Sequence, residues 1–207
     1  MSTTWFDSLK KSFADVPVGA DNTISTTEFL DASESLATLF DVLGSKAFTP
    51  VKSDLLGNVK KLRDRQLAAP TESETVQALS LNELKAKKHT ASEGLLWLVR
   101  GLDFTVQSLR RHVNTPTEKL SDSFRGAYGS SLGKHHSWAM GKVFSLAMGA
   151  APDNESFYKS LASVPAGGSV SEEDKTKIQE QLTREVQALE NIVAILQKFQ
   201  EQPEAKW

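Results

Sequence analysis

The sequence predicts an all-α protein whose helices pack in two layers. Apolar residues recur at helical spacing in several long segments, and no segment of convincing length alternates between polar and apolar residues as a β-strand would. Short turn-forming segments separate the helical ones, and neither an internal repeat nor a long Pro/Gly/Ser-rich linker divides the chain. We therefore expect a single domain over residues 1–207.

Residues 1–24 place aromatic and aliphatic side chains among polar ones and include a turn-prone Gly-Ala-Asp-Asn segment, so we expect them to dock on the core or to stay partly mobile. Ser25 and the glutamate three residues later have capping-box spacing, which predicts a helix from Ser25 until Gly44. Pro50 suits the first turn of the next helix, because its fixed φ and missing N–H cost nothing there, and Pro70 ends that helix.

Four further elements follow in the middle of the chain. A helix rich in good helix formers is expected over 73–88, and another over 91–113, where apolar residues form one stripe. The helical pattern resumes over 120–150, although three glycines in its first half lower the helix propensity there. A short helix over 155–162 precedes a glycine- and serine-rich surface loop over 164–169.

The last helix opens with Ser171 and Asp174, again at capping-box spacing. Its apolar residues repeat at near-heptad intervals and are Ile178, Leu182, Leu189, Ile192, Leu196 and Phe199. This spacing would suit a coiled coil, but the pattern covers only about three heptads. Packing against the chain's own helices is therefore the favoured interpretation.

Composition and charge exclude several classes of protein. With 39% hydrophobic and 24% charged residues, the chain resembles an ordinary globular protein. A net charge of -2 and a pI of about 6.1 would not concentrate nucleic acid, so no such partner is expected. The absence of cysteine excludes disulfides, thiolate metal sites and cysteine nucleophiles. No signal peptide or membrane span is apparent, which predicts a soluble, cytoplasmic protein that can still touch membranes peripherally.

A row of polar residues lies along the helix that begins at Pro50. Asp54, Asn58, Lys61 and Arg65 occur at i, i+4, i+7 and i+11, which places them on one side of that helix. Asp54 accepts hydrogen bonds, Lys61 donates them and Asn58 does both, which is the repertoire for binding sugar hydroxyls; a phosphate would favour more cations. On its own, however, such a ladder is more often an ordinary solvated helix face.

Trp97 lies in the apolar run SEGLLWLVRGLDF, one residue away from the main leucine stripe. An indole can stack on the apolar face of a sugar ring while its N–H donates a hydrogen bond. From its position alone, Trp97 is more readily interpreted as a core residue than as a platform for a sugar.

The segment KHHSWAMGKVF contains two adjacent histidines. On a helix, His135 and His136 would point about 100° apart and could not readily share an ion, so no metal site is expected. His136 is in line with apolar residues of the expected helix and should point inward, where its imidazole needs a hydrogen-bond partner. Trp138 falls on another face beside Lys134 and Lys142, a combination that seats proteins at a lipid interface.

Three motifs follow one another along the chain: Asp54-x-x-x-Asn58-x-x-Lys61, then Leu-Trp97-Leu-x-Arg100-Gly-Leu, then His136-Ser-Trp138. Together they resemble the glycolipid transfer protein family, and the flanking LFDVLGSKAFTPVKSDLLGNVKKL and LAMGAAP extend the likeness over residues 25–162. RDRQLAAPTESETVQAL and TASEGLLWLVRGLDF are similar to the fungal heterokaryon-incompatibility branch. The resemblance implies a two-layer helical sandwich with a hydrophobic lipid tunnel between the layers.

The resemblance also implies roles for individual residues. The first sugar of a lipid headgroup would be held by hydrogen bonds from Asp54, Asn58 and Lys61. The indole of Trp97 would stack on the same sugar. Asp54 would in addition accept a hydrogen bond from the ceramide amide N–H, while His136 would donate one to the amide carbonyl.

Neighbouring residues extend this implied site. Additional headgroup contacts could come from Arg65, Arg100 and His135. Trp138 and Lys142 would touch the membrane. The C-terminal QPEAKW lacks the tyrosine-bearing tail of animal members, which leaves open whether Trp207 covers the site.

The function predicted from these features is non-enzymatic binding of one glycosphingolipid, such as the monohexosylceramide glucosylceramide, for transfer between membranes or for sensing. No cofactor is implied, and a monomer with transient membrane contact is expected. The first alternative is a carrier of ceramide-1-phosphate or another anionic sphingolipid. The branch of the family that carries ceramide-1-phosphate has cations where this chain has Asn58 and Trp97.

Two further classes of function remain as alternatives. A glycosidase would need a second carboxylate about 5–10 Å from Asp54, and neither Glu93 nor Asp103 is spaced convincingly. A purely helical protein-interaction module would rest on the heptad-like last helix.

Overall fold

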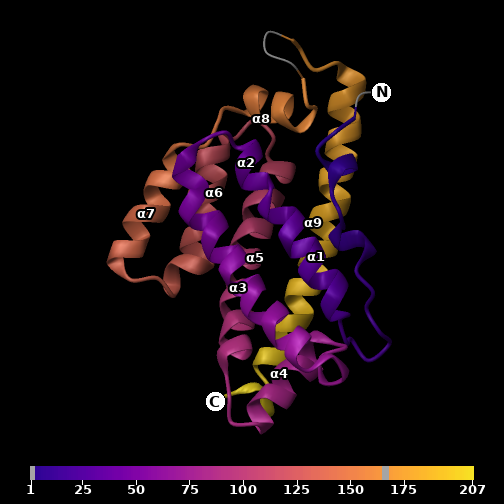
Figure 1. Cartoon of the computed structure of the whole chain (residues 1–207). Helices are drawn as coiled ribbons and strands as arrows, with labels where there is room; N and C mark the ends of the chain where they lie inside the picture. The colour runs from indigo at the N-terminus through magenta and orange to yellow at the C-terminus, as the bar shows by residue number, and fades with distance from the viewer. Residues whose placement is uncertain (1–2, 165–167) are drawn as a thin grey trace.

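The computed structural model describes residues 3–164 and 168–207, and this part of the chain is helical, which confirms the predicted fold class (Figure 1). Its helices are α1 (Thr26–Ala37), α2 (Leu39–Val42), α3 (Thr49–Ala68), α4 (Val76–Lys85), α5 (Thr90–Asn114), α6 (Leu120–Ser130), α7 (Trp138–Gly149), α8 (Asn154–Leu161) and α9 (Glu172–Gln200).

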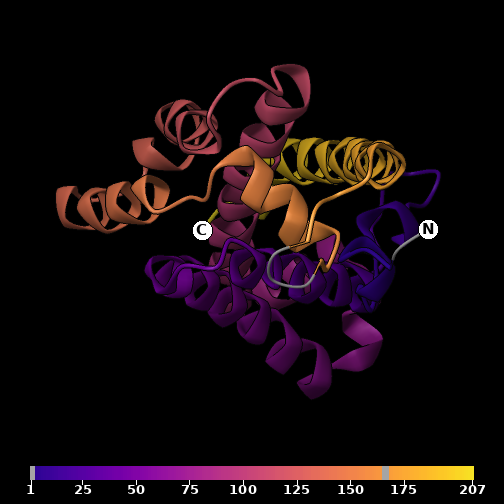
Figure 2. The ribbon, with the colours of Figure 1, turned by 90° about the horizontal axis from the view of Figure 1, so that it is seen from above.

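Helix α5 is the central helix of the fold. It packs against α3 on one side, and α3 in turn packs against α1. On the other side, α5 packs against α6 and α9. Figure 2 shows these two groups of helices as separate layers, so the predicted two-layer sandwich is confirmed.

Amphipathic stripes explain why these helices pack as they do. The predicted stripe of α5 is buried along its whole length, through Leu95, Leu98, Leu102, Val106 and Leu109. The near-heptad residues of α9 are also buried, and α9 packs on α5. The last helix therefore uses its apolar stripe in the core of its own chain.

Aromatic rings connect the two layers. We call Phe40, Phe48, Phe104, Phe124 and Phe144 the interlayer aromatic cluster. Successive rings in this cluster have centroids 6.0–6.1 Å apart, and every ring is buried. Because the cluster takes its members from the α2–α3 region as well as from α5, α6 and α7, its rings fill the interior between the layers.

The described part of the N-terminal segment docks on the helices. The Trp5 indole is buried and its Nε1 donates a hydrogen bond to Thr38 Oγ1 over 2.8 Å. Phe13 is buried as well, and its backbone N–H donates to the carboxylate of Glu185 on α9 over 3.0 Å. This segment thus packs against both α1 and α9.

The helix expected over 120–150 is interrupted. Helix α6 ends at Ser130, a 3₁₀ turn covers Leu132–Lys134, and α7 begins at Trp138 with Ser137 as its N-cap. The chain makes a close contact at this interruption: a Cβ at Gly133 would lie 2.7 Å from the backbone oxygen of Tyr128. Only glycine allows the chain to pass so close to the preceding helix.

Two other predictions from sequence need adjustment. The helix expected from Ser25 to Gly44 breaks at Thr38, which separates α1 from α2; Gly44 ends the segment with a positive φ of 72°, as expected. Of the loop expected over 164–169, residues 165–167 lie outside the described residues. None of the helices in the described residues combines the length and apolar character that crossing a bilayer requires.

A histidine lies in the core near α8. His112 of α5 is fully buried, with ring centroids 5.7 Å from Phe157 and 5.9 Å from Tyr158. Neither ring nitrogen has a hydrogen-bond partner among the described residues. Burial lowers the pKa of His112, while attraction to Glu118 opposes this shift.

The substitution His112→Leu should make the free energy of unfolding less dependent on pH. In the wild type, the unfolded chain binds a proton near the ordinary histidine pKa of about 6.5. The buried ring resists that proton, so stability is lost as the pH falls below this value. The variant should gain roughly 1–3 kcal/mol at neutral pH, because it no longer buries an unpaired polar group, and its advantage over the wild type should widen toward pH 5.

Urea unfolding of both proteins at neutral pH and near pH 5 measures this effect. His135 and His136 also have lowered pKa values, so the variant should keep part of the pH dependence. An equal loss of stability in the two proteins over this interval would contradict the role assigned to His112.

Candidate functional site

The polar row on α3 is connected by hydrogen bonds. Asn58 is buried, and its Nδ2 donates to the Asp54 backbone oxygen over 3.0 Å and lies 3.5 Å from Asp54 Oδ2. Lys61 Nζ donates to Asn58 Oδ1 over 3.3 Å. These contacts fix the amide orientation of Asn58 between an acceptor and a cation. The row therefore presents acceptors at one end and a donor at the other.

Arg65, the last member of the row, already has a partner. Its Nη2 lies 2.6 Å from Glu72 Oε2. The guanidinium is mostly shielded from solvent and its charge is balanced locally. Arg65 is therefore less available to a ligand than Lys61, which forms no ion pair within the described part of the chain.

Gly94 brings α5 into close contact with this row. A Cβ at position 94 would lie 3.0 Å from Lys61 Cβ and 3.2 Å from Leu62 Cδ1. The missing side chain lets α5 approach α3 and places the half-buried Trp97, one turn further along, in the region of Lys61. Trp97 also packs against the core, so its ring belongs to the boundary between core and solvent.

His136 lies beside Trp97, although it does not belong to a helix. The two rings are stacked at 23° with centroids 6.0 Å apart. The expectation that His136 continues a helical stripe is wrong, because residues 135–137 lie between the 3₁₀ turn and α7. The interruption of the expected helix turns the chain back and brings the imidazole to α5.

The charges of Asp54 and His136 influence each other. Desolvation by surrounding protein raises the pKa of Asp54 even though its side chain keeps exposed surface, and attraction to His136 and Lys61 opposes the shift. Burial lowers the pKa of His136, while Asp54 raises it and His135 and Arg100 lower it further. A neutral His136 keeps one N–H donor and one acceptor nitrogen.

Arg100 and His135 lie at the same edge of the site. The Arg100 guanidinium carbon is 4.8 Å from the centroid of the Trp97 ring, a cation–π contact. Burial lowers the pKa of Arg100, and this residue forms no ion pair with any residue that the structure describes. His135 keeps exposed surface; partial desolvation and the nearby charges of Arg100 and Lys134 lower its pKa, and Asp103 opposes this shift.

Tyr128 of α6 is a site residue that the sequence analysis missed. Its Oη lies 3.0 Å from His136 Nδ1. On one continuous helix, residues eight positions apart would point about 80° from each other, so the pair could not have been expected. A signal for it would have required knowing that the helix is broken at Gly133.

The predicted membrane residues lie on α7 beside the site. Trp138 is 77% exposed, and Lys142 Nζ lies 3.9 Å from the centroid of its ring. The exposed apolar face continues through Leu146, which is 73% exposed, and through Met140 and Val143. Most of the large apolar side chains that are exposed in the described residues are on this one helix.

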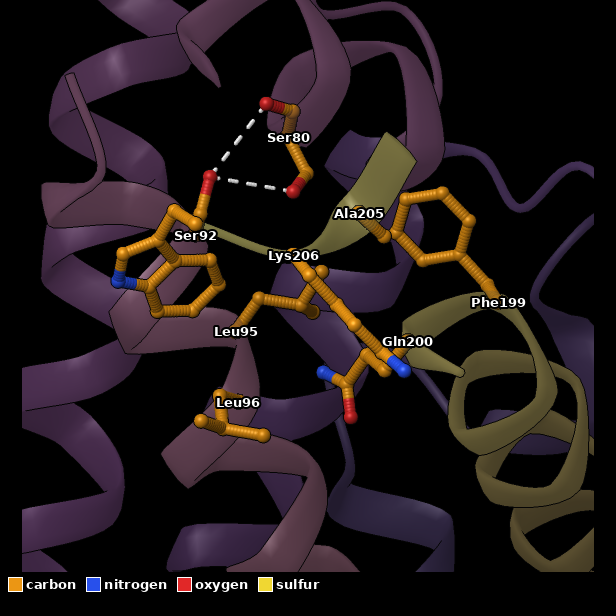
Figure 3. A pocket seen from close by; sticks show the side chains of 9 residues that line it. Ser80, Ser92, Leu95, Leu96, Phe199, Gln200, Ala205 and Lys206 are labelled. Carbon is orange, nitrogen blue, oxygen red and sulfur yellow. Dashed lines mark hydrogen bonds between the residues drawn. The ribbon is translucent and has the colours of Figure 1, made fainter. Parts of the chain in front are cut away.

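Trp207 packs at the start of α5. Its indole is stacked on His89 at 9°, with centroids 5.9 Å apart. Together with Leu95, Leu96 and Phe199 it lines a cavity of about 310 Å³ between α5 and the C-terminal segment (Figure 3). Trp207 thus stacks on His89 and makes no ring contact with Trp97 or His136 among the described residues. No cluster of metal-ligating side chains occurs in the described ranges.

Comparison with known proteins identifies the group to which this fold and site belong. The family described as "Glycolipid transfer protein (GLTP)" matches residues 24–163. The chain belongs to the glycolipid transfer protein family. Members of this family carry lipids and are not enzymes, so the site has to be understood as a binding site.

Individual members of the glycolipid transfer protein family match nearly the whole chain. A "Glycolipid transfer protein" from Aureobasidium melanogenum is 53% identical over 204 residues, which cover 99% of this chain and 96% of the relative. The human "Pleckstrin homology domain-containing family A member 8" is 34% identical over 202 residues, covering 96% of this chain and 38% of the relative. This chain thus corresponds to about 38% of the length of that larger protein.

Solved structures agree with this assignment. The crystal structure of HET-C2, a fungal glycolipid transfer protein, has a TM-score of 0.89 at 51% identity and covers 99% of this chain and 100% of that one. A FAPP2 structure described as selecting simple glycosphingolipids with the GLTP fold has a TM-score of 0.84 at 34% identity, covering 96% and 95%. Mouse ceramide-1-phosphate transfer protein shares the fold with a TM-score of 0.79 at 19% identity, covering 96% of each chain.

The substitution Gly94→Ala should destabilise the contact between α3 and α5. The added methyl group would meet Lys61 and Leu62, and crowding of this kind costs about 1–3 kcal/mol. Gly57→Ala on α3 is the matched control, since a Cβ there meets nothing within 4 Å. The control should be neutral or stabilise the helix by up to about 1 kcal/mol. Chemical denaturation measures both, and equal effects of the two substitutions would show that Gly94 does not set this contact.

Proposed function

We propose that this chain binds one glycosphingolipid, such as glucosylceramide, and transfers it between membranes or senses it. The observation that carries the proposal is the position of the hydrogen-bonded row on α3 beside Trp97 of α5. Relatives support it, because HET-C2 is a fungal glycolipid transfer protein and FAPP2 is described as selecting simple glycosphingolipids.

A single hexose suits the chemistry of the row. Asn58 and Lys61 would bind hydroxyls of the sugar, and the Asp54 carboxylate would accept from a further hydroxyl. The Trp97 indole would stack on the apolar face of the ring. Arg100, which already lies against Trp97, would contact the edge of the sugar. Arg65 contributes less in this proposal because it forms an ion pair with Glu72.

The ceramide amide would lie between Asp54 and His136. Asp54 accepts a hydrogen bond from the amide N–H, and His136 donates one to the amide carbonyl. The electrostatic attraction between the two side chains is consistent with this pairing. A group with one donor and one acceptor would complement a carboxylate and an imidazole N–H.

The hydrocarbon chains would enter among the rings of the interlayer aromatic cluster. Phe144 of this cluster is 4.6 Å from His136, centroid to centroid, so the interior begins directly behind the amide site. Each buried methylene group contributes about 0.8 kcal/mol. The chains would therefore provide most of the affinity, while the polar residues select the headgroup.

An anionic sphingolipid is the second candidate ligand, because two cations could bind its headgroup. Lys61 and Arg100 form no ion pair in the described part of the chain; Lys61 lies beside Gly94 of α5, and Arg100 lies over the Trp97 ring. The nearby Asp54 opposes a negative headgroup, however, and a phosphate offers no apolar face to the indole. A neutral sugar is consequently the better fit.

The exposed face of α7 would touch the membrane. Trp138 and Leu146 offer apolar surface, and Lys142 beside the indole would face anionic headgroups. We further propose that the chain acts as a cytoplasmic monomer that meets membranes reversibly. The near-heptad stripe of α9 is buried in its own core and offers no surface to a second copy.

The substitution Asp54→Val should reduce lipid transfer by at least tenfold, because it removes the acceptor for both the sugar and the amide N–H. Transfer of a fluorescent glucosylceramide between vesicles measures this. Asp64→Val is the matched control, since Asp64 lies on the same helix but pairs with Lys60 at the surface. Transfer at the wild-type rate by a folded Asp54→Val protein would contradict the assigned site.

The substitution Trp138→Ala should weaken binding to vesicles by roughly tenfold, because the exposed indole no longer enters the interface. Leu67→Ala serves as the control, since Leu67 is 73% exposed on α3 and does not belong to the α7 face. Sedimentation with lipid vesicles reports the bound fraction. If both substitutions lower it equally, the contact is not specific to α7.

A further inference from the structure

Tyr128 contacts one of the two ring nitrogens of His136. The phenol oxygen lies 3.0 Å from Nδ1, which leaves Nε2 as the second polar atom of the imidazole. No other side-chain hydrogen bond of His136 is formed with the described residues. This hydrogen bond therefore favours one of the two positions for the imidazole proton.

The Tyr128 ring is held on several sides. Phe104 meets it edge-on at 89° with centroids 6.0 Å apart, and Phe144 is stacked on it at 23° and 5.5 Å. A Cβ at Gly133 would lie 2.9 Å from Tyr128 Cε1, and one at Gly141 would lie 3.6 Å from the hydroxyl oxygen. Packing on this scale fixes the position of the ring and of its hydroxyl oxygen.

Acid–base chemistry decides which way the hydrogen bond runs. A phenol is a far better proton donor than a neutral imidazole N–H, and an imidazole nitrogen is a far better acceptor than a phenol oxygen. Burial raises the pKa of Tyr128, so the hydroxyl keeps its proton. Burial also lowers the pKa of His136, so the ring stays neutral and has a single N–H. The Tyr128 O–H therefore donates to Nδ1.

We propose that Tyr128 is a positioning residue that holds His136 in the Nε2–H form, so that the imidazole presents a donor to the carbonyl of an N-acylated lipid. The part concerning the ligand rests on the proposed function. The inference has a consequence for specificity: a lipid with an acyl amide offers the carbonyl that Nε2–H needs, whereas a lysolipid with a free amine does not.

The tautomer can be measured without any lipid. In the ¹⁵N-histidine-labelled full-length protein, the His136 nitrogen shifts should show Nε2–H in the wild type and a change toward Nδ1–H in Tyr128→Phe. The phenylalanine retains the ring, so the packing should survive. Tyr158→Phe is the matched control, because the protein has two tyrosines and this one contacts His112 instead. A His136→Gln variant assigns the signals.

A second measurement protects the test against a folding defect. The helical circular dichroism and the urea unfolding midpoint of Tyr128→Phe should match those of the wild type, so that a change in the His136 signals reports the lost hydroxyl. Nδ1–H in the wild type would overturn the proposal. Unchanged His136 signals in Tyr128→Phe would overturn it as well.

Binding measurements then examine specificity. Tyr128→Phe should bind glucosylceramide about tenfold more weakly while binding glucosylsphingosine as the wild type does, since only the acylated lipid uses the carbonyl contact. An equal loss for both lipids would reduce Tyr128 to a structural role. If the wild type binds neither lipid, the proposed function fails, whereas the tautomer result still decides the role of Tyr128.

Discussion

Gly94 allows α3 and α5 to approach closely, and the polar row of one helix consequently lies near the indole of the other. Every later feature of the site depends on this approach. Helix α6 packs on α5 and carries Tyr128, and the segment that follows α6 returns His136 to Trp97. The site is thus produced by the packing of helices around α5 and does not belong to any single helix.

Local contacts order the site before a ligand arrives. Asn58 is held between Asp54 and Lys61, while His136 is held between Tyr128, Trp97 and Phe144. Side chains that are already fixed lose less conformational entropy on binding, so more of each hydrogen bond contributes to affinity. The charges are also limited: Glu72 neutralises Arg65, and the charge of Asp54 is opposed by that of Lys61. Such a balance favours a neutral polar headgroup.

Much of the fold could be predicted from sequence, because its signals are local. Pro50 and Ser171 mark the starts of α3 and α9, and the spacing of the row places its residues on one helix face. The break after α6 could not be predicted, because a glycine such as Gly133 weakens a helix without specifying a turn. The Tyr128–His136 hydrogen bond depends on that break, and the Arg65–Glu72 pair joins separate elements. Local spacing cannot reveal either contact.

The interlayer aromatic cluster has a consequence for how cargo would be loaded and released. Because these buried rings pack against one another between the layers, an incoming hydrocarbon chain would have to exchange with phenylalanine contacts. Loading would then be a repacking of these rings, and their return to the packing seen here would keep the apolar interior away from water on release.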